Sequence, residues 1–216
     1  MDPTVGIQHL LGIPYVEDGM LDAHGCWTYF GHPEIKQPHP GLNCSGFLVA
    51  AAQHLLGCRL TLQQITQDRL SDSGQGAPQG KDWDFGWDLI LNLSEGLTRR
   101  WIVPNGTSPI GSEDARITPG FRIQDSSAWT HIFPRMQDGR IYLASLWRTQ
   151  RTGIRHHHVA LLLRDSSGRT WFYQTLPGGR THRLQISSAK GFARLCEMFG
   201  PSERILLLEV EPTAST

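Results

Sequence analysis

Apolar residues recur every three or four positions along several segments in the first part of the chain. The clearest case spans residues 45–56, and Gly57 follows it as a helix stop. The same spacing predicts helices over residues 5–11, 61–70 with Thr61 as the N-cap, 87–93 and 187–199, and a short helix over 129–136 that is broken at Pro134. Residues 12–43 are rich in Gly, Pro and His, which predicts mostly loop.

From about residue 99 the pattern changes to short apolar runs that predict β-strands. These runs cover residues 100–103, 140–147, 157–164, 170–175 and 204–210. Residues 165–168 read Asp-Ser-Ser-Gly, a turn sequence that joins the third and fourth runs into a hairpin. Helices that come early and antiparallel strands that come late predict an α+β fold. Because there is no internal repeat and no long linker, we expect residues 1–216 to form a single domain.

The strongest chemical signal lies directly before the clearest helix, where residues 43–47 read Asn-Cys-Ser-Gly-Phe. A cysteine at a helix N-terminus faces unsatisfied backbone N–H groups and the positive end of the helix dipole. That environment is expected to lower the pKa of the Cys44 thiol and to suit a nucleophile. The small residues that follow leave backbone donors open to an oxyanion. A buried cysteine that merely opens a core helix explains this motif, taken alone, equally well.

A thiol nucleophile needs a base, and three consecutive histidines open the apolar run of residues 159–163. The period of two in a strand predicts that His156 and His158 share one face and that His157 lies on the other. We favour His158 as the base because it adjoins the buried run, and His156 is the alternative. Gln174 is a polar residue among the aromatics of the next strand, so its side-chain oxygen could orient the imidazole.

These motifs together resemble those of the NlpC/p60 peptidases, which are papain-like cysteine enzymes that act on bacterial cell-wall peptides. The similarity rests on Gly-Ile-Pro-Tyr at residues 12–15, the cysteine motif at 43–47, His-Val at 158–159 and a polar third residue at 174, in that order. It covers roughly residues 5–56 and 137–176 and leaves a family-atypical insert at about 60–136.

The resemblance implies a papain-like fold in which the nucleophile helix packs on an antiparallel sheet. It implies a site with Cys44 as nucleophile, His158 as base, Gln174 as orienting residue, and Tyr15 and Ser45 as substrate contacts. No cofactor and no metal are expected. The implied reaction is hydrolysis of amide bonds in peptidoglycan stem peptides or crosslinks.

Two other classes of function fit the same residues. One is a papain-like thiol protease or transacylase that acts on substrates outside the cell wall, and the other is a non-catalytic binding module on the same fold. The chain starts Met-Asp-Pro-Thr, without the basic and apolar segments of a signal peptide, so we expect synthesis in the cytoplasm. A cell-wall substrate then favours export by a dedicated, type VI-like system as an antibacterial toxin with a cognate immunity protein, or recycling of cell-wall peptides inside the cell.

Composition narrows the class of protein and the set of candidate nucleophiles and metal ligands. The 216 residues are 39% hydrophobic and 19% charged, which is ordinary for a globular protein, and no apolar run is long enough for a membrane span. Cys26 is a weaker candidate nucleophile because Gly31 and Pro33 break the segment after it, so no helix follows. Cys58 and Cys196 are expected to be buried apolar residues. The ten histidines show no zinc-ligand spacing.

Charge is unevenly distributed although the net charge is zero. Residues 1–98 carry four basic and eleven acidic side chains, whereas residues 99–183 carry thirteen arginines and five acidic side chains. The basic residues are scattered and form no nucleic-acid-binding motif, which argues against a nucleic-acid partner. The asymmetry indicates either two differently charged solvated faces or a basic wall beside a site for anionic groups.

Overall fold

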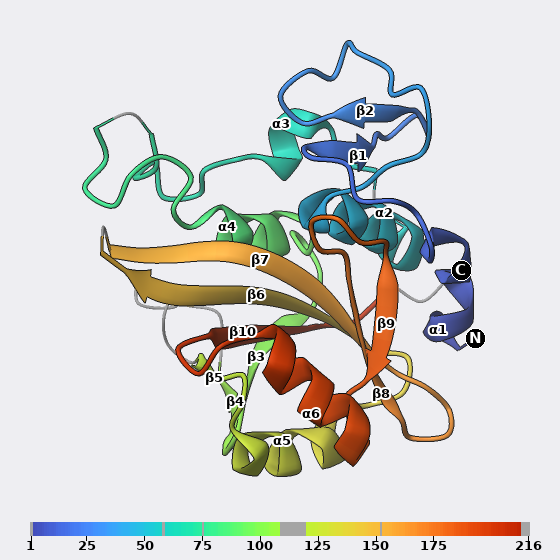
Figure 1. The fold of residues 1–216 in the computed structure, drawn as a ribbon, viewed down its shortest axis with the longest axis vertical. Helices are drawn as coiled ribbons and strands as arrows, with labels where there is room; N and C mark the ends of the chain where they lie inside the picture. The colour runs from blue at the N-terminus through green and yellow to red at the C-terminus, as the bar shows by residue number, and fades with distance from the viewer. Residues whose placement is uncertain (1, 58, 75, 109–119, 152, 213–216) are drawn as a thin grey trace.

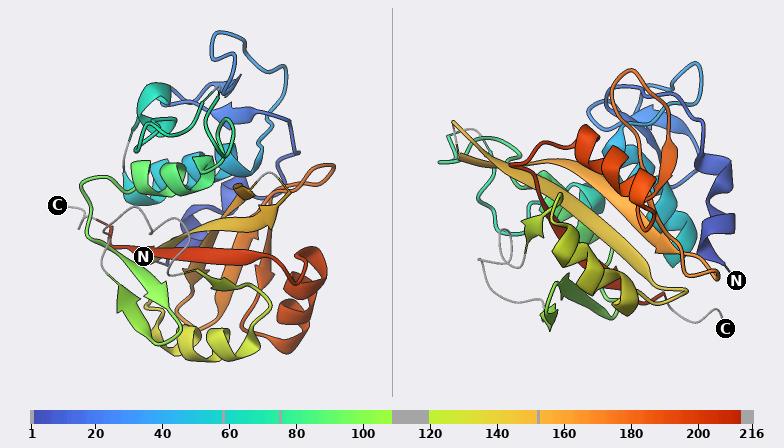
Figure 2. Two further views of the ribbon diagram at one scale, coloured as in Figure 1. Left: turned by 90° about the vertical axis from the view of Figure 1, so that its left-hand side faces the viewer. Right: turned by 60° about the horizontal axis from the view of Figure 1, so that its bottom comes forward.

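The computed structural model describes residues 2–57, 59–74, 76–108, 120–151 and 153–212. It confirms the α+β prediction, because helices pack on both faces of an eight-stranded antiparallel sheet (Figures 1 and 2). The strand order is β4-β3-β10-β6-β7-β8-β9, and β5 pairs with β10. The strands of this sheet are β3 (Arg99–Val103), β4 (Gly106–Ser108), β5 (Phe121–Arg122), β6 (Ile141–Gln150), β7 (Gly153–Arg164), β8 (Thr170–Gln174), β9 (His182–Gln185) and β10 (Arg204–Val210).

The helices and a separate hairpin complete the fold. The hairpin is formed by β1 (Gly19–Leu21) and β2 (Trp27–Tyr29). The helices are α1 (Pro3–Gly6), α2 (Cys44–Leu56), α3 (Leu62–Ile65), α4 (Phe85–Asn92), α5 (Ser126–Ile132) and α6 (Ala189–Met198), with 3₁₀ turns at Gln8–Leu10 and Phe133–Arg135. No helix in the described ranges is long and apolar enough to cross a membrane.

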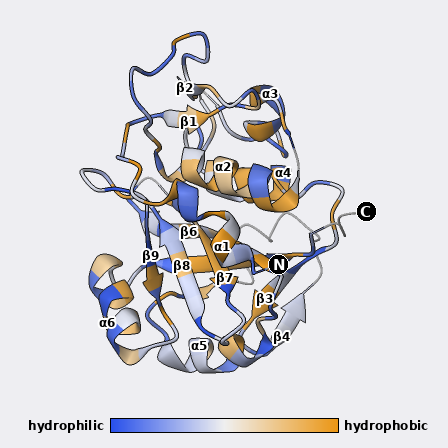
Figure 3. Ribbon diagram, turned by 90° about the vertical axis from the view of Figure 1, so that its right-hand side faces the viewer, coloured by the Kyte–Doolittle hydropathy of each residue, from blue (hydrophilic) through white to orange (hydrophobic). Residues whose placement is uncertain are grey.

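Alternation along β7 divides the interior into two cores. Val159 and Leu161 face the core that contains α2 and α4, whereas Ala160 and Leu162 face the core that contains α5 and α6. Hydrophobic residues occupy much of α2 and of the strands beneath it (Figure 3). A strand buried on both faces reads as a continuous apolar run, which is why the sequence of β7 lacks a polar side.

The ends of α2 are fixed by local chemistry. The Asn43 side chain accepts a hydrogen bond from the Gly46 N–H at 2.7 Å and so caps the N-terminus. Gly57 ends the helix in the left-handed conformation, with φ of 66°. The prediction of a helix over 45–56 is therefore confirmed, and Cys44 is its first residue.

The start of α2 lies directly against β1, and only a glycine fits at the point of contact. A Cβ atom added at Gly46 would overlap the backbone carbonyl oxygen of Gly19. We expect Gly46→Ala to lower the free energy of unfolding by about 1–3 kcal/mol or more, because backbone has to move. Urea denaturation measures this, and Gly200→Ala is the matched control because nothing lies within 4 Å of its added Cβ. Equal transition midpoints for the two variants would contradict this packing.

The segment that precedes the cysteine is tied to a distant part of the chain. The backbone N–H groups of Gly12 and Tyr15 donate to the carbonyl oxygens of Thr181 and Gly179 at 2.8 and 2.9 Å. Tyr15 also forms a parallel bridge with Leu42. Residues 12–15 therefore connect the loop between β8 and β9 to the approach to α2.

Several predicted elements differ in length from those observed. The strands predicted over 100–103, 140–147, 157–164, 170–175 and 204–210 are all present, and β6 and β7 are longer than predicted. The helix that Thr61 caps is a single turn, although its capping box is complete. The loop prediction for residues 12–43 is wrong at β1 and β2, whose three-residue strands are too short to show a clear alternation. Strand β9 was not predicted, because its four residues are all only partly buried.

Candidate active site

A cavity of about 310 Å³ lies where the start of α2 meets β7 and the start of α4. Its wall includes the predicted nucleophile and all three consecutive histidines. The lining residues are Cys44, Ser45, Asp82, Phe85, Gly86, Arg155, His156, His157, His158 and Val159.

The Cys44 sulfur is held against the strand that carries the predicted base. The backbone N–H of Val159 donates a hydrogen bond to this sulfur, and Val159 directly follows His158. The Ser45 hydroxyl lies 4.0 Å from the sulfur. The Cys44 sulfur therefore lies against the backbone of β7 one residue from His158, although the two segments are more than 100 positions apart in the sequence.

His158 is buried and oriented by the predicted third residue. Its Nε2 lies 2.8 Å from Oε1 of Gln174, and the Gln174 side chain is fully buried. Because a side-chain carbonyl oxygen can only accept, Nε2 carries the proton and donates it. Nδ1 therefore holds the lone pair of the neutral ring and is the nitrogen that can accept a proton.

The three histidines have different partners because β7 has an irregularity at this point. Leu146 pairs with His158 and Trp147 pairs with His156, so His157 is an extra residue in the strand. The prediction that His156 and His158 share one face is therefore wrong. His156 packs against the rings of Trp83 and Trp147 and bonds Ser145 through Nδ1 at 2.8 Å, whereas His157 lies 3.3 Å from the buried Glu203 carboxylate.

Tyr15 lies close to the nucleophile but outside the lining of the cavity. It is partly buried, and its pKa is raised by burial and, to a smaller extent, by the negative charges of Glu17 and of the Cys44 thiolate. The structure therefore places Tyr15 and Ser45 beside Cys44 at the start of α2, and it joins His158 and Gln174 as a bonded pair on the adjoining strands. Of these, Cys44, Ser45 and His158 line the cavity.

Burial dominates the protonation of the candidate pair. It raises the pKa of the Cys44 thiol, although N–H donors from Val159, Ser45 and Cys44 itself act in the opposite direction. The expectation of a lowered thiol pKa is therefore wrong, since desolvation outweighs the helix N-terminus. Burial also lowers the pKa of His158 to about 4, against the hydrogen bond to Gln174. At neutral pH the resting site thus holds a thiol and a neutral imidazole.

This protonation state has a measurable consequence. Only the thiolate reacts with iodoacetamide, so we expect the rate of Cys44 alkylation to rise with pH through an apparent pKa above the usual thiol value of about 8.5. Mass spectrometry of the peptide that contains Cys44 measures this rate between pH 5 and pH 10. A rate that already levels off below pH 7 would show an ion pair in the resting site.

The other candidate ligands and thiols lie elsewhere. Within the described part of the chain, no group of three His, Cys, Asp or Glu side chains is placed to hold a metal ion. Cys26 and Cys196 are free thiols that do not line the cavity, and Cys58 lies outside the described residues. Two lining residues, Asp82 and Arg155, were not singled out from the sequence, because isolated charges in loops and at strand starts carry no pattern.

Comparison with known proteins gives one structural similarity. No family model matches the sequence, and no curated protein matches it. The fold is similar to the crystal structure of protein LPG0564 from Legionella pneumophila str. Philadelphia 1, which is assigned to the family DUF1460. The two chains are 11% identical with a TM-score of 0.50, and the match covers 98% of this chain and 88% of the other.

This comparison corrects the family assignment. The NlpC/p60 assignment is wrong, because the matching fold is that of a protein from a different family and no family model supports it. The residues that suggested it are few: a cysteine at a helix N-terminus and a histidine at a strand start meet the needs of thiol chemistry in general. Asn43 and Arg140 also stand where the NlpC/p60 pattern has aspartates. The chain shares its fold with a member of DUF1460, and this is the relationship that the comparison supports.

Proposed function

We propose that this chain is a cysteine peptidase or amidase whose catalytic group has a papain-like arrangement. Cys44 is the nucleophile at the start of a helix, His158 is the base on the sheet, and Gln174 orients the base. The observation that carries the proposal is the contact of the Cys44 sulfur with the Val159 N–H, one residue from an imidazole whose Nε2 is bonded to Gln174 at 2.8 Å. Together with the shared cavity, this combination suits acyl transfer.

The proposed reaction begins from the neutral pair. As the Cys44 sulfur attacks the amide carbonyl carbon, the thiol proton moves to Nδ1 of His158. The backbone N–H groups at the start of α2 stabilise the oxyanion that forms. The imidazolium then protonates the leaving amine, and the C–N bond breaks to leave a thioester. Water, deprotonated by His158, attacks the thioester, which releases a carboxylic acid and restores the thiol.

The proposed substrates are stem peptides or crosslinks of peptidoglycan. Two properties of the cavity support a short, charged peptide. Its volume of about 310 Å³ accommodates only a few residues, and its wall carries both a carboxylate, on Asp82, and a guanidinium, on Arg155. Such a peptide presents amide bonds close to free carboxylate and ammonium groups.

Incubation of purified stem peptides with the protein tests this function. We expect new fragments whose combined mass exceeds that of the parent by one water, and their masses identify the bond that is cut. Protein alkylated at Cys44 is the control and should produce none. Intact peptides with an unmodified, folded protein would contradict the substrate assignment, and cleavage by the alkylated protein would contradict the mechanism.

A separate prediction concerns the orienting residue. We expect Gln174→Ala to reduce kcat by up to about 10²-fold, because the imidazole loses the partner that fixes its tautomer. The bond to Gln174 raises the pKa of His158, so its loss should move the acidic limb of the kcat/KM profile to lower pH. The pH profile separates this effect from simple destabilisation, which would lower the rate at every pH equally.

A further inference from the structure

We propose that Arg155 and Asp82 select substrates that carry a carboxylate and an ammonium group beside the scissile amide. This inference rests on the proposed function and specifies its substrate class. Both residues line the cavity that contains Cys44, and both are exposed to solvent. They come from segments about 70 residues apart, which the fold places side by side.

Backbone contacts hold the two residues on adjoining segments. The N–H of His156 donates to the carbonyl oxygen of Trp83 at 2.8 Å, so the neighbours of Asp82 and of Arg155 are bonded to each other. A second contact lies just beyond, where the Ile154 N–H donates to the Gln79 side chain at 3.2 Å. The loop that carries Asp82 is therefore anchored along the start of β7.

The local backbone conformation fixes Asp82 at the end of this loop. Its φ is 51°, a left-handed conformation that is uncommon for residues other than glycine. Three residues later α4 begins, and Gly86 of α4 packs so closely on Ser145 and Val159 that an added Cβ would meet both side chains. The position of Asp82 is thus set on both sides by packed segments.

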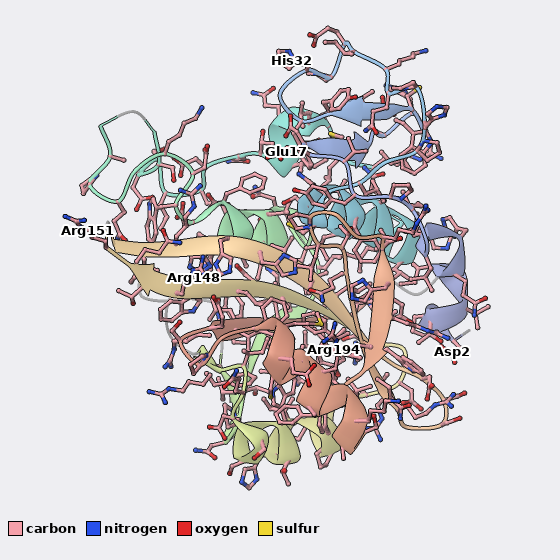
Figure 4. All side chains as sticks on the ribbon, viewed as in Figure 1. Asp2, Glu17, His32, Arg148, Arg151 and Arg194 are labelled. Atoms are coloured by element: carbon pink, nitrogen blue, oxygen red, sulfur yellow. The ribbon has the colours of Figure 1, made fainter. Side chains whose placement is uncertain are left out.

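Neither charge is neutralised by an ion pair within the part of the chain that the structure describes. Among the described residues, Asp82 and Arg155 have no ion-pair partner within 4 Å, and they do not pair with each other. Arg148 lies directly opposite Arg155 across β6 and β7, but its guanidinium is bonded to Glu203 at 3.0 Å. Figure 4 shows Arg148 and Arg151 on this same β6–β7 hairpin.

This arrangement leaves two opposite charges open to one ligand. Like charges directly opposite on a sheet are unfavourable, so an unpaired Arg155 beside Arg148 favours an anion. A guanidinium binds a carboxylate through two parallel hydrogen bonds, and a carboxylate such as that of Asp82 binds an ammonium group. The ligand that satisfies both residues carries both charges, whereas a neutral peptide satisfies neither.

A panel of matched peptides tests the inference. The parent probe is L-Ala-γ-D-Glu-L-Lys, and each further probe lacks one charge: the N-acetylated form, the form with the Glu carboxylate as an amide, the C-terminal amide, and the form with norleucine in place of lysine. The measured quantity is the ratio of kcat/KM between the parent and each neutralised form. A ratio within one variant does not depend on how much of that variant is folded.

We expect the wild-type protein to prefer the parent over one carboxamide form and over one form without an ammonium group, each by about tenfold, as for one charge-assisted hydrogen bond. Arg155→Gln should abolish the preference for the carboxylate, and Asp82→Asn should abolish the preference for the ammonium. Arg151→Gln is the matched control, because Arg151 lies on the same hairpin but does not line the cavity, and it should keep both preferences.

The outcomes separate this inference from the function on which it rests. If the wild-type protein cleaves all five probes at equal rates, or prefers a neutral form, the inference is overturned and the amidase activity stands. The same holds if Arg155→Gln and Asp82→Asn keep both preferences. If the wild-type protein cleaves none of the probes while it cleaves purified stem peptides, the charge selection proposed here is overturned. If the wild-type protein cleaves neither the probes nor the purified stem peptides, the proposed function itself is overturned.

Discussion

Replacement of Cys44 by alanine is expected to lower kcat/KM for stem-peptide hydrolysis by about 10³-fold or more, while the protein remains folded. The sulfur forms the covalent intermediate, and alanine leaves no atom that can attack the carbonyl carbon. The Cys44 side chain is partly exposed at the start of α2, and the Asn43 cap that stabilises this helix is retained. Hydrolysis followed by chromatography, together with thermal unfolding, measures both effects.

The matched control for this variant is Cys196→Ala. Cys196 is also a partly buried free thiol, but it lies on α6 and does not line the cavity. We expect the Cys196→Ala variant to retain full activity. Equal loss in both variants would point to general damage, and full activity in Cys44→Ala would exclude the thiol mechanism.

Replacement of His158 by alanine is expected to lower kcat/KM by about 10³-fold, because the thiol then has no base. In the wild-type protein the pKa of His158 is lowered to about 4, so the imidazole is neutral and able to accept a proton at all pH values above that. Activity should therefore persist down to about pH 4 and fall as the ring becomes protonated below it. This acidic limb should be absent from the residual activity of His158→Ala.

His156→Ala tests the alternative base directly. The His156 ring is buried between Trp83 and Trp147 and bonds Ser145, so we expect this variant to lose stability. Activity per folded molecule, with folded protein measured by circular dichroism, should fall by no more than about tenfold. Retained activity in His158→Ala with complete loss in His156→Ala would assign the base to His156.

Much of the fold could be predicted because segments such as α2 and β7 each show a clear pattern of apolar residues. The apolar spacing of α2, with Gly57 at its end, predicts a helix. The continuous apolar run of β7 predicts a buried strand. The hairpin of β1 and β2 could not be predicted in this way. Its strands have three residues each, and Gln37, whose side chain donates to the backbone oxygens of Thr28 and Gly41, lies outside the hairpin that it holds.

The sequence could supply the five candidate residues, but not the lining residues Asp82 and Arg155, the electrostatics of the site or its fine geometry. The position of Cys44 at a helix start follows from local sequence, and so does that of Gln174 in an aromatic strand. The extra residue in β7 depends on pairing with β6 and on the Glu203 carboxylate beside His157, which come from other parts of the chain. The raised pKa of the thiol likewise follows from burial by distant segments. Local sequence alone contains neither fact.

The bonds between residues 12–15 and the loop that follows β8 also affect when the thiol can become active during synthesis. The donors at Gly12 and Tyr15 find their acceptors at Thr181 and Gly179, more than 160 residues later. Contacts of such long sequence separation form late in folding, since the intervening chain has to be ordered first. On a ribosome, Cys44 emerges long before Gln174 and this loop. A nascent chain therefore carries the nucleophile without its oriented base, and the amidase we propose would gain activity only after synthesis has passed Thr181.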